Sequence, residues 1–243
     1  MQLEAITLHL RPRPMDEACD LGVRMVQVHA RAVWASFLPP YALVLLLAVA
    51  SARLADWLPA VMIFWLKPWL DRSVLYVLSR AAFGMATTPA DLWRSQRRVW
   101  WRQWLPTLTT RRLSPWRSFV APAQQLEGQD GAAGALRRRQ LLRGRQGAAL
   151  RMHSAFANAE GLFVVGVLML ASLFIPETTG LTLWRLLLDS GETASHLFAA
   201  AYALVVGLLE PFYVGAGFAM YLNRRVELEA WDLEQELRLV FAS

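Results

Sequence analysis

The sequence predicts an all-α, polytopic membrane protein: a single membrane domain over residues 1–243, with four transmembrane helices and further amphipathic helices at the membrane surface. Three observations lead to this class. Hydrophobic residues make up 56% of the chain while the mean hydropathy is only +0.30, so apolar and polar segments must alternate. Several apolar stretches reach the roughly 20 residues that cross a bilayer as a helix. Arginine and tryptophan gather beside these stretches, as they do at membrane interfaces.

The positive charge is concentrated in the middle of the chain. All basic residues except Lys67 are arginines, and the net charge is +6. Residues 94–151 hold 13 arginines against two acids, a charge of +11, so the rest of the chain carries −5. Such a segment binds an anionic surface, either nucleic acid or lipid headgroups. Because tryptophans lie among these arginines, we expect a bilayer with anionic headgroups as the partner and no nucleic acid.

The sequence shows no catalytic or metal-binding motif. A single cysteine, Cys19, excludes an internal disulfide and a cysteine-based metal cluster. The histidines at 9, 29, 153 and 196 are scattered and lack metal-ligand spacing. Nucleophile-elbow, phosphate-loop and dinucleotide-binding motifs are also absent from the sequence. We therefore expect no enzyme activity, no cofactor and no metal.

The N-terminal third of the chain predicts a surface helix followed by two spans. An amphipathic helix is expected over 14–33, because apolar and charged residues fall on opposite faces. The first span covers 34–55, and Pro39 and Pro40 are expected to change the chain direction near its start. The second span covers 57–82 and follows so short a loop that the two helices must be antiparallel neighbours.

The second span is unusual because it carries charges. Lys67, Asp71 and Arg72 would lie near mid-depth, where charged groups need partners. Three alternatives are open. Lys67 and Asp71 pair with each other one turn apart; Lys67 or Arg72 pairs with Glu210 on the fourth span; or the helix breaks at Pro68 and re-enters the membrane.

The region 85–152 is expected to be cytoplasmic or interfacial, with a helix from about residue 131 running straight into the third span, 156–175. Glu160, near the basic end of that span, is expected at the membrane interface. Earlier in the region, three tryptophans and three arginines fall on different faces of a predicted helix, which suits the headgroup layer. The expected headgroup contacts are Arg94, Arg98, Arg102, Trp93, Trp100 and Trp104.

The fourth span, 196–222, carries an acid near its middle. Glu210 is costly in hydrocarbon and must be paired or neutral. Pro211 follows it and is expected to bend the helix there. Tyr202 and Tyr213 share its face, so they extend a polar stripe toward one membrane surface. The expected intramembrane polar cluster is Glu210, Tyr213, Tyr202, Lys67, Asp71 and Arg72.

Small residues recur every four positions around the expected bend and would let another helix approach closely. A tail helix over 223–241 has one apolar and one acidic face, and can pack on the arginine-rich middle or on a partner. The expected helix-packing positions of the fourth span are Ala203, Gly207, Pro211 and Gly215.

The distribution of arginine predicts the topology. The N-terminal segment, the central region and the end of the fourth span are basic, whereas the loops at 53–56 and 176–195 are not. The positive-inside rule then places both termini in the cytoplasm.

Three runs carry a resemblance to a known family: LEPFYVGAGFAMYLNRRVELEAWDLE (209–234), FWLKPWLDRSVLYVLSRAAFG (64–84) and SPWRSFVAPAQQLEG (114–128). Together they resemble a group of proteobacterial inner-membrane proteins without an assigned function. The chain is more loosely similar to the membrane domain of glycerophosphodiester phosphodiesterases. The resemblance implies a multi-pass protein of the bacterial inner membrane and assigns no catalytic residues.

Two functional classes remain. The first is a non-catalytic scaffold or accessory subunit of a membrane or cell-envelope complex, whose partners are other membrane or cytoplasmic proteins. The alternative is a small transporter or lipid-handling protein that uses the polar stripe around Glu210.

Overall fold

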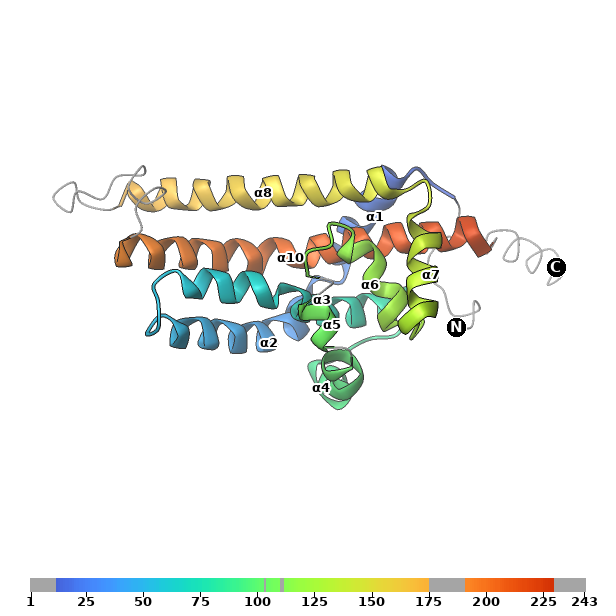
Figure 1. The fold of residues 1–243 in the computed structure, drawn as a ribbon, viewed down its shortest axis with the longest axis horizontal. Coiled ribbons are helices and arrows are strands. Elements are labelled where there is room, and N and C mark those ends of the chain that lie inside the picture. The colour runs from blue at the N-terminus through green and yellow to red at the C-terminus, as the bar shows by residue number, and fades with distance from the viewer. Residues whose placement is uncertain (1–11, 103, 110–111, 175–190, 230–243) are drawn as a thin grey trace.

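In the computed structural model, the described residues are 12–102, 104–109, 112–174 and 191–229, and within these ranges the chain is helical with connecting turns and no strand (Figure 1). Four long helices form a bundle in which α10 contacts each of the other three. They are α2 (Ala30–Ser51), α3 (Leu58–Ala82), α8 (Gln146–Ser172) and α10 (Glu192–Glu229).

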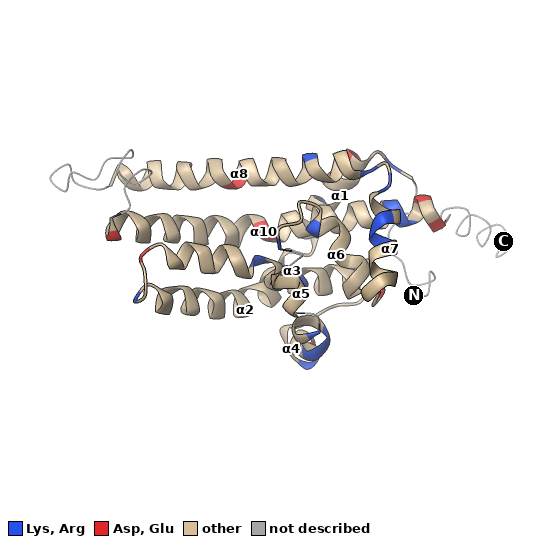
Figure 2. Cartoon of the chain, viewed as in Figure 1, with Lys and Arg blue, Asp and Glu red and all other residues tan. Residues whose placement is uncertain are grey.

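Shorter elements gather over the half of the bundle nearer to α7 (Figure 1). α1 packs along α10, and α6 packs against both α10 and α3. Basic residues gather on α4 and the adjoining π-helical turn η2, on α7, and on the neighbouring part of α10 (Figure 2). These elements are α1 (Met15–Val28), α4 (Pro89–Arg94), the π-helical turn η2 (Arg97–Trp101), α5 (Trp104–Leu108), α6 (Arg117–Gln125) and α7 (Gly131–Leu142).

Three helices, α2, α8 and α10, are long and apolar enough to cross a membrane. The helix α3, which corresponds to the expected second span, is 25 residues long but contains Lys67, Asp71, Arg72 and Arg80, so length and composition alone do not place it with the other three. Of the three apolar stretches, that of α8 is the least covered by the protein, with 11% of its residues buried.

The change of direction expected at the prolines occurs earlier. α1 ends at Val28, and α2 begins at Ala30 and continues through Pro39 and Pro40. A proline inside a helix is tolerated when neighbouring helices hold the segment. Here Tyr41 donates a hydrogen bond to the carbonyl oxygen of Ala203 on α10, at 2.5 Å. The neighbour thus fixes α2 immediately after the two prolines.

The helix expected to run from residue 131 into the third span is interrupted. α7 ends at Leu142, and Gly144 adopts φ +72°, a conformation that favours glycine. α8 then starts at Gln146, ten residues before the expected span, because its first turns already pack within the bundle: Ala149 and Met152 are buried.

The second and fourth expected spans differ in how they end. The expected span 57–82 corresponds to α3, which ends before Gly84 at φ +68°. By contrast, α10 runs without interruption from Glu192 to Glu229, so residues 223–229 of the expected tail helix continue the fourth span. The remainder of the tail, 230–241, lies outside the described residues.

Candidate functional site

The carboxylate of Glu210 lies at the centre of the bundle. Its side chain is 2% exposed, and its Oε2 lies 2.7 Å from the Nζ of Lys67 on α3. Its other oxygen accepts a hydrogen bond from Arg117 on α6. Two cations from two other helices therefore neutralise this acid, as a buried carboxylate requires.

Lys67 links Glu210 to a second acid. Its ammonium donates to Glu160 on α8 while it also contacts Glu210 on α10. Glu160, expected at the membrane interface, instead faces the bundle interior, with its side chain 20% exposed. Three alternatives were open for the charges of α3, and the structure contains the cross-helix pair between Lys67 and Glu210. Within the described residues there is no ion pair between Lys67 and Asp71.

Arg117 was missed by sequence reasoning, which assigned residues 85–152 to the surface. Its Nε lies 3.7 Å from Asp71, and its Cζ lies 4.9 Å from the centre of the Tyr213 ring. Burial lowers the pKa of this guanidinium, but the nearby carboxylates of Asp71 and Glu210 outweigh that effect and raise the pKa above its usual value. Arg117 is therefore a permanent cation in the core.

The packing of α6 on α10 explains how Arg117 reaches the core. A Cβ added at Gly217 would overlap Ser118, so the glycine lets α6 approach the backbone of α10. Phe119, which is fully buried, anchors α6 in the same contact. The signal in the sequence was the apolar run around Arg117, WRSFVAPA, inside an otherwise basic region.

These groups form one network, the buried ion cluster. It contains two cations and three carboxylates, contributed by α3, α6, α8 and α10. A buried pair adds little net stability, because desolvation offsets the attraction, but removing one partner is costly. The cluster therefore fixes how the four helices are arranged. Its members are Lys67, Asp71, Arg117, Glu160 and Glu210.

Of the two cations considered as partners of Glu210, Lys67 makes the ion pair, whereas the hydrogen bonds of Arg72 to described residues go elsewhere. Its Nη1 donates to the carbonyl oxygen of Arg102 at 2.6 Å and to Thr107 Oγ1 at 3.3 Å. Its own carbonyl oxygen accepts from Gln125 Nε2 at 2.8 Å. Arg72 thus holds the segment around α5 and the end of α6 against α3.

The two tyrosines of the expected stripe border the cluster. The Nζ of Lys67 lies 5.8 Å from the ring centre of Tyr202. The hydroxyl of Tyr213 is 3.0 Å from Nδ1 of His153 on α8. His153, read from sequence only as a scattered histidine, therefore belongs to the wall of the site.

A small cavity of about 150 Å³ lies beside the buried ion cluster. Its polar wall includes Lys67, Arg117, Glu160, His153 and Arg112. Burial and the charge of Arg117 lower the pKa of the Arg112 guanidinium below its usual value.

A larger cavity of about 440 Å³, here called the basic cavity, lies between α3, α6 and α7. Arg117 lines both cavities, so it is their shared wall. The other charged residues of the basic cavity are three arginines and one acid. They are Arg72, Arg138, Arg139 and Asp71.

Two residues that line the basic cavity, Arg117 and Ser118, carry buried polar atoms without a hydrogen-bond partner among the described residues. Ser118 is 4% exposed, and its Oγ has no hydrogen-bond partner among the described residues. Nη1 of Arg117 is likewise buried without one. Arg138 and Arg139 make no ion pair within the part of the chain that the structure describes. Arg138 is half-buried and Arg139 is exposed, so both guanidinium groups can reach a bound anion.

The wall formed by α7 is fastened to the bundle by a second ion network. Arg137 donates two hydrogen bonds to Glu127, at 2.8 and 2.9 Å. Glu127 also accepts from the hydroxyl of Tyr221 on α10, at 2.5 Å. The hydrogen bonds that Arg137 donates to Glu127 raise the pKa of its guanidinium despite its partial burial.

The small residues of α10 pack against helices of the same chain. A Cβ at Gly207 would lie 3.1 Å from the ring of Tyr41, and a Cβ at Gly215 would lie 2.8 Å from the carbonyl oxygen of Gly22 on α1. The carbonyl of Gly207 also accepts from Trp34 Nε1 at 3.3 Å. This ribbon is therefore an internal packing surface of α10.

The expected headgroup residues divide into two groups. Arg94, Arg98 and Arg102 are exposed, as are Trp93 and Trp104. Trp100 is a correction, because it is 5% exposed and cannot face lipid headgroups.

The burial of Trp100 has a local cause. Its Nε1 donates to Ser73 Oγ at 2.9 Å, and its ring centre lies 5.4 Å from that of Trp69. The π-helical turn η2 rotates Val99 and Trp100 toward α3, which a regular helical wheel does not anticipate.

One further group of side chains can bind a metal. Asp56, Glu192 and His196 lie together at the end of the bundle opposite α7, although their spacing in the sequence gave no such signal.

A scan against models of known protein families and searches of curated proteins and of solved structures found no match. Fold and site therefore define the class: an all-helical protein with three helices able to cross a membrane and a buried ion cluster among its long helices. The family resemblance of the three sequence runs stays a prediction.

Proposed function

We propose that this chain is a multi-pass membrane protein that binds the phosphate headgroup of an anionic lipid in the basic cavity. The observation that carries the proposal is the charge of that cavity, four arginines against one aspartate. Arginine forks match phosphate oxygens in charge and geometry. The volume of about 440 Å³ lies within the range of small-molecule sites.

The rest of the wall favours a lipid over free phosphate. Apolar side chains also line the cavity, and they can contact the glycerol and the first acyl carbons of a lipid. These residues are Leu75, Val120, Ala121, Leu142 and Val214. A ligand with a charged head and an apolar tail matches this mixed lining.

The same geometry supports a placement in the membrane. We propose that α3 also crosses the membrane, in addition to α2, α8 and α10, because its 25 residues extend about 37 Å at 1.5 Å each, more than the roughly 30 Å of hydrocarbon. The charges near its middle are buried against other helices. The arginine-rich elements and both termini would then lie on the cytoplasmic side of a bacterial inner membrane, where anionic headgroups are available.

The shared wall suggests how binding is linked to the bundle. A phosphate in the basic cavity would compete with Asp71 and Glu210 for Arg117, the cation common to both cavities. Occupancy would thereby loosen or reorient α6 relative to α10. This is the lipid-handling alternative, with Arg117 added to the polar stripe.

The scaffold function is placed second. The small-residue ribbon of α10, expected to let another helix approach closely, packs on α1 and α2 of the same chain. The acidic tail, the other support for a scaffold, falls largely outside the described residues.

The test uses the full chain in mild detergent and short-chain dioctanoyl phosphatidic acid, with binding measured by calorimetry. The variant Arg138→Gln/Arg139→Gln removes two cavity charges. The matched control, Arg24→Gln/Arg31→Gln, removes two exposed arginines of the segment around α1 and α2. We expect the cavity variant to weaken binding by about tenfold or more per arginine, since 1.4 kcal/mol corresponds to tenfold.

Three ligands separate the outcomes. Dioctanoyl phosphatidylcholine should bind at least tenfold more weakly than phosphatidic acid, and inorganic phosphate should bind weakly because it lacks the apolar part. Equal loss in both arginine variants would indicate surface electrostatics and would contradict the proposal. If phosphate and phosphatidic acid bound equally well, the ligand of the cavity would be a free anion and not a lipid.

A further inference from the structure

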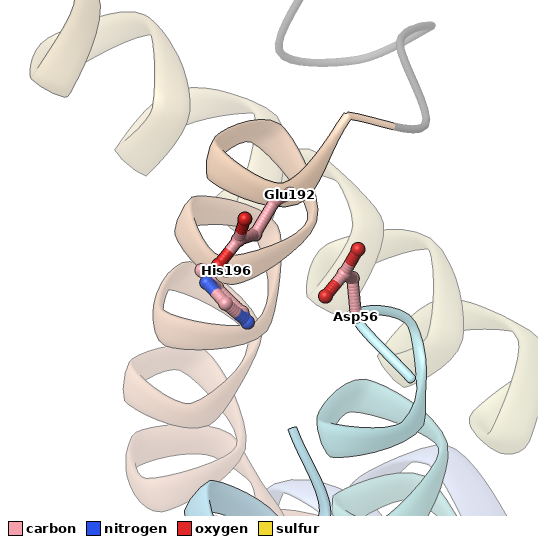
Figure 3. Close-up of side chains that lie close together, drawn as sticks. All are labelled: Asp56, Glu192 and His196. Carbon is pink, nitrogen blue, oxygen red and sulfur yellow. The ribbon is translucent and has the colours of Figure 1, made fainter. Parts of the chain in front are cut away.

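Three metal-binding side chains from two distant parts of the sequence meet at one end of the bundle. Asp56 lies in the turn between α2 and α3, while Glu192 and His196 lie on the first turns of α10. Figure 3 shows the Asp56 carboxylate directed toward the other two side chains. One ligand atom from each lies within 4.8 Å of the others.

From this arrangement we infer a Zn²⁺ site formed by Asp56, Glu192 and His196. Glu192 and His196 are four residues apart and so share a helix face. One imidazole and two carboxylates form a ligand set that Zn²⁺ accepts, with a fourth position left for water. The imidazole also disfavours Mg²⁺ and Ca²⁺, which prefer oxygen ligands.

The spacing of the ligand atoms is close to that of a bound site. Two ligands at about 2.1 Å from a tetrahedral Zn²⁺ lie roughly 3.4 Å apart. Glu192 is exposed and Asp56 is in a turn, so side-chain rotation can close the distance from 4.8 Å.

The state of His196 is the second observation. Its Nε2 is buried and has no hydrogen-bond partner among the described residues. Asp56 and Glu192 likewise make no ion pair within the described part of the chain, although an imidazole lies beside them. Buried polar nitrogens in native proteins have partners, and a metal ion would supply one here.

The site would act as a clamp. It joins the turn before α3 to the start of α10, the two helices that contribute Lys67 and Glu210 to the buried ion cluster. Metal binding at this end would hold the two helix ends together without contact with the basic cavity, so the inference is independent of lipid binding.

The test is Zn²⁺ binding to the full chain, purified without a polyhistidine tag, measured by equilibrium dialysis with elemental analysis. We expect one Zn²⁺ per chain, and at least about tenfold weaker binding in Asp56→Asn, Glu192→Gln or His196→Asn. The control His29→Asn removes a histidine between α1 and α2 and should bind Zn²⁺ as the unmodified chain does. Zn²⁺ should also raise the melting temperature of the unmodified and control chains, while the three site variants should not respond.

Three results would overturn the inference. The first is no binding at micromolar Zn²⁺, and the second is equal loss in His29→Asn. The third is displacement of Zn²⁺ by equimolar Mg²⁺, which would show only diffuse attraction to acidic residues. Because Asp56→Asn changes a single turn residue, it keeps the test decisive even if a helix variant misfolds.

Discussion

Replacing Glu210 by glutamine tests whether the buried ion cluster holds the bundle together. The substitution keeps the shape of the side chain but leaves Lys67 and Arg117 without their shared acid. Removing one partner of a buried pair costs about 3–5 kcal/mol. Here Lys67 keeps Glu160, and Arg117 keeps Asp71 at 3.7 Å, so the lower end applies.

For a chain of this size, 1 kcal/mol shifts the melting temperature by about 2–4 °C, so a loss of about 3 kcal/mol predicts a decrease of about 6–12 °C. The measurement is thermal unfolding followed by tryptophan fluorescence in mild detergent at one protein concentration and scan rate. Asp20→Asn is the control, because Asp20 is exposed on α1, and it should change stability by less than about 0.5 kcal/mol.

A second substitution sharpens the test. The double variant Lys67→Met/Glu210→Gln lacks one cation and one acid, so the cluster keeps its net charge. The ion pair between Arg117 and Asp71 remains. The acid left over, Glu160, is 20% exposed and can reach water. We expect the double variant to recover at least a third of the lost melting temperature, a coupling of about 1 kcal/mol. A Glu210→Gln variant as stable as Asp20→Asn, or a fully additive double variant, would refute the cluster as a structural unit.

Three further predictions concern the packing around the site. Gly22→Ala should cost about 1–3 kcal/mol, because its Cβ would overlap the α10 backbone, while Gly147→Ala, whose Cβ meets open space, should be neutral or stabilising in the same thermal assay. Burial raises the pKa of the Cys19 thiol to about 11, above the roughly 8.5 of a free thiol. Alkylation at pH 8 should therefore be about 100-fold slower than in the unfolded chain. Because the folded state favours the neutral thiol, its contribution to the free energy of unfolding should be complete below pH 8.5 and should be lost as the pH rises through 11. Rapid alkylation at pH 8 would contradict the burial of Cys19. Trp100→Phe removes the hydrogen bond to Ser73 and should cost about 2 kcal/mol. A loss no larger than that of a surface substitution would mean that Trp100 faces lipid after all.

Much of the helical framework could be predicted from sequence. The apolar stretches on either side of the charged residues indicated a span over 57–82, and α3 covers Leu58–Ala82. The cost of burying a charge indicated that Glu210 needs a partner, and Lys67 lies 2.7 Å away. The first inference depends on local composition, and the second depends on the high cost of burying an unpaired charge. Both can be recognised from the sequence alone.

The second partner of Glu210 could not be predicted in the same way. Arg117 lies on a nine-residue helix within a strongly basic region, where charge patterning favours a solvated surface. Its role depends on the contact between α6 and Gly217, which brings together residues far apart in the chain. The metal-binding group Asp56, Glu192 and His196 is hidden for the same reason.

Local irregularities account for the remaining differences. The π-helical turn at Arg97–Trp101 moves Trp100 off the face that a regular wheel assigns to it. Gly144, at positive φ, ends one helix where the sequence pattern indicated continuity. Tertiary packing outweighed the expected helix break at Pro39 and Pro40.

The most direct test of the proposed lipid site is to identify what occupies the basic cavity in the membrane. A photoreactive residue at position 135, which lines the cavity, should crosslink an anionic phospholipid in cell membranes. The same residue at position 132, exposed on the same helix, should not. Mass spectrometry of the purified adduct should show the lipid at 135, and Arg138→Gln/Arg139→Gln should abolish it. Equal labelling at both positions, or capture of neutral lipids alone, would contradict the account.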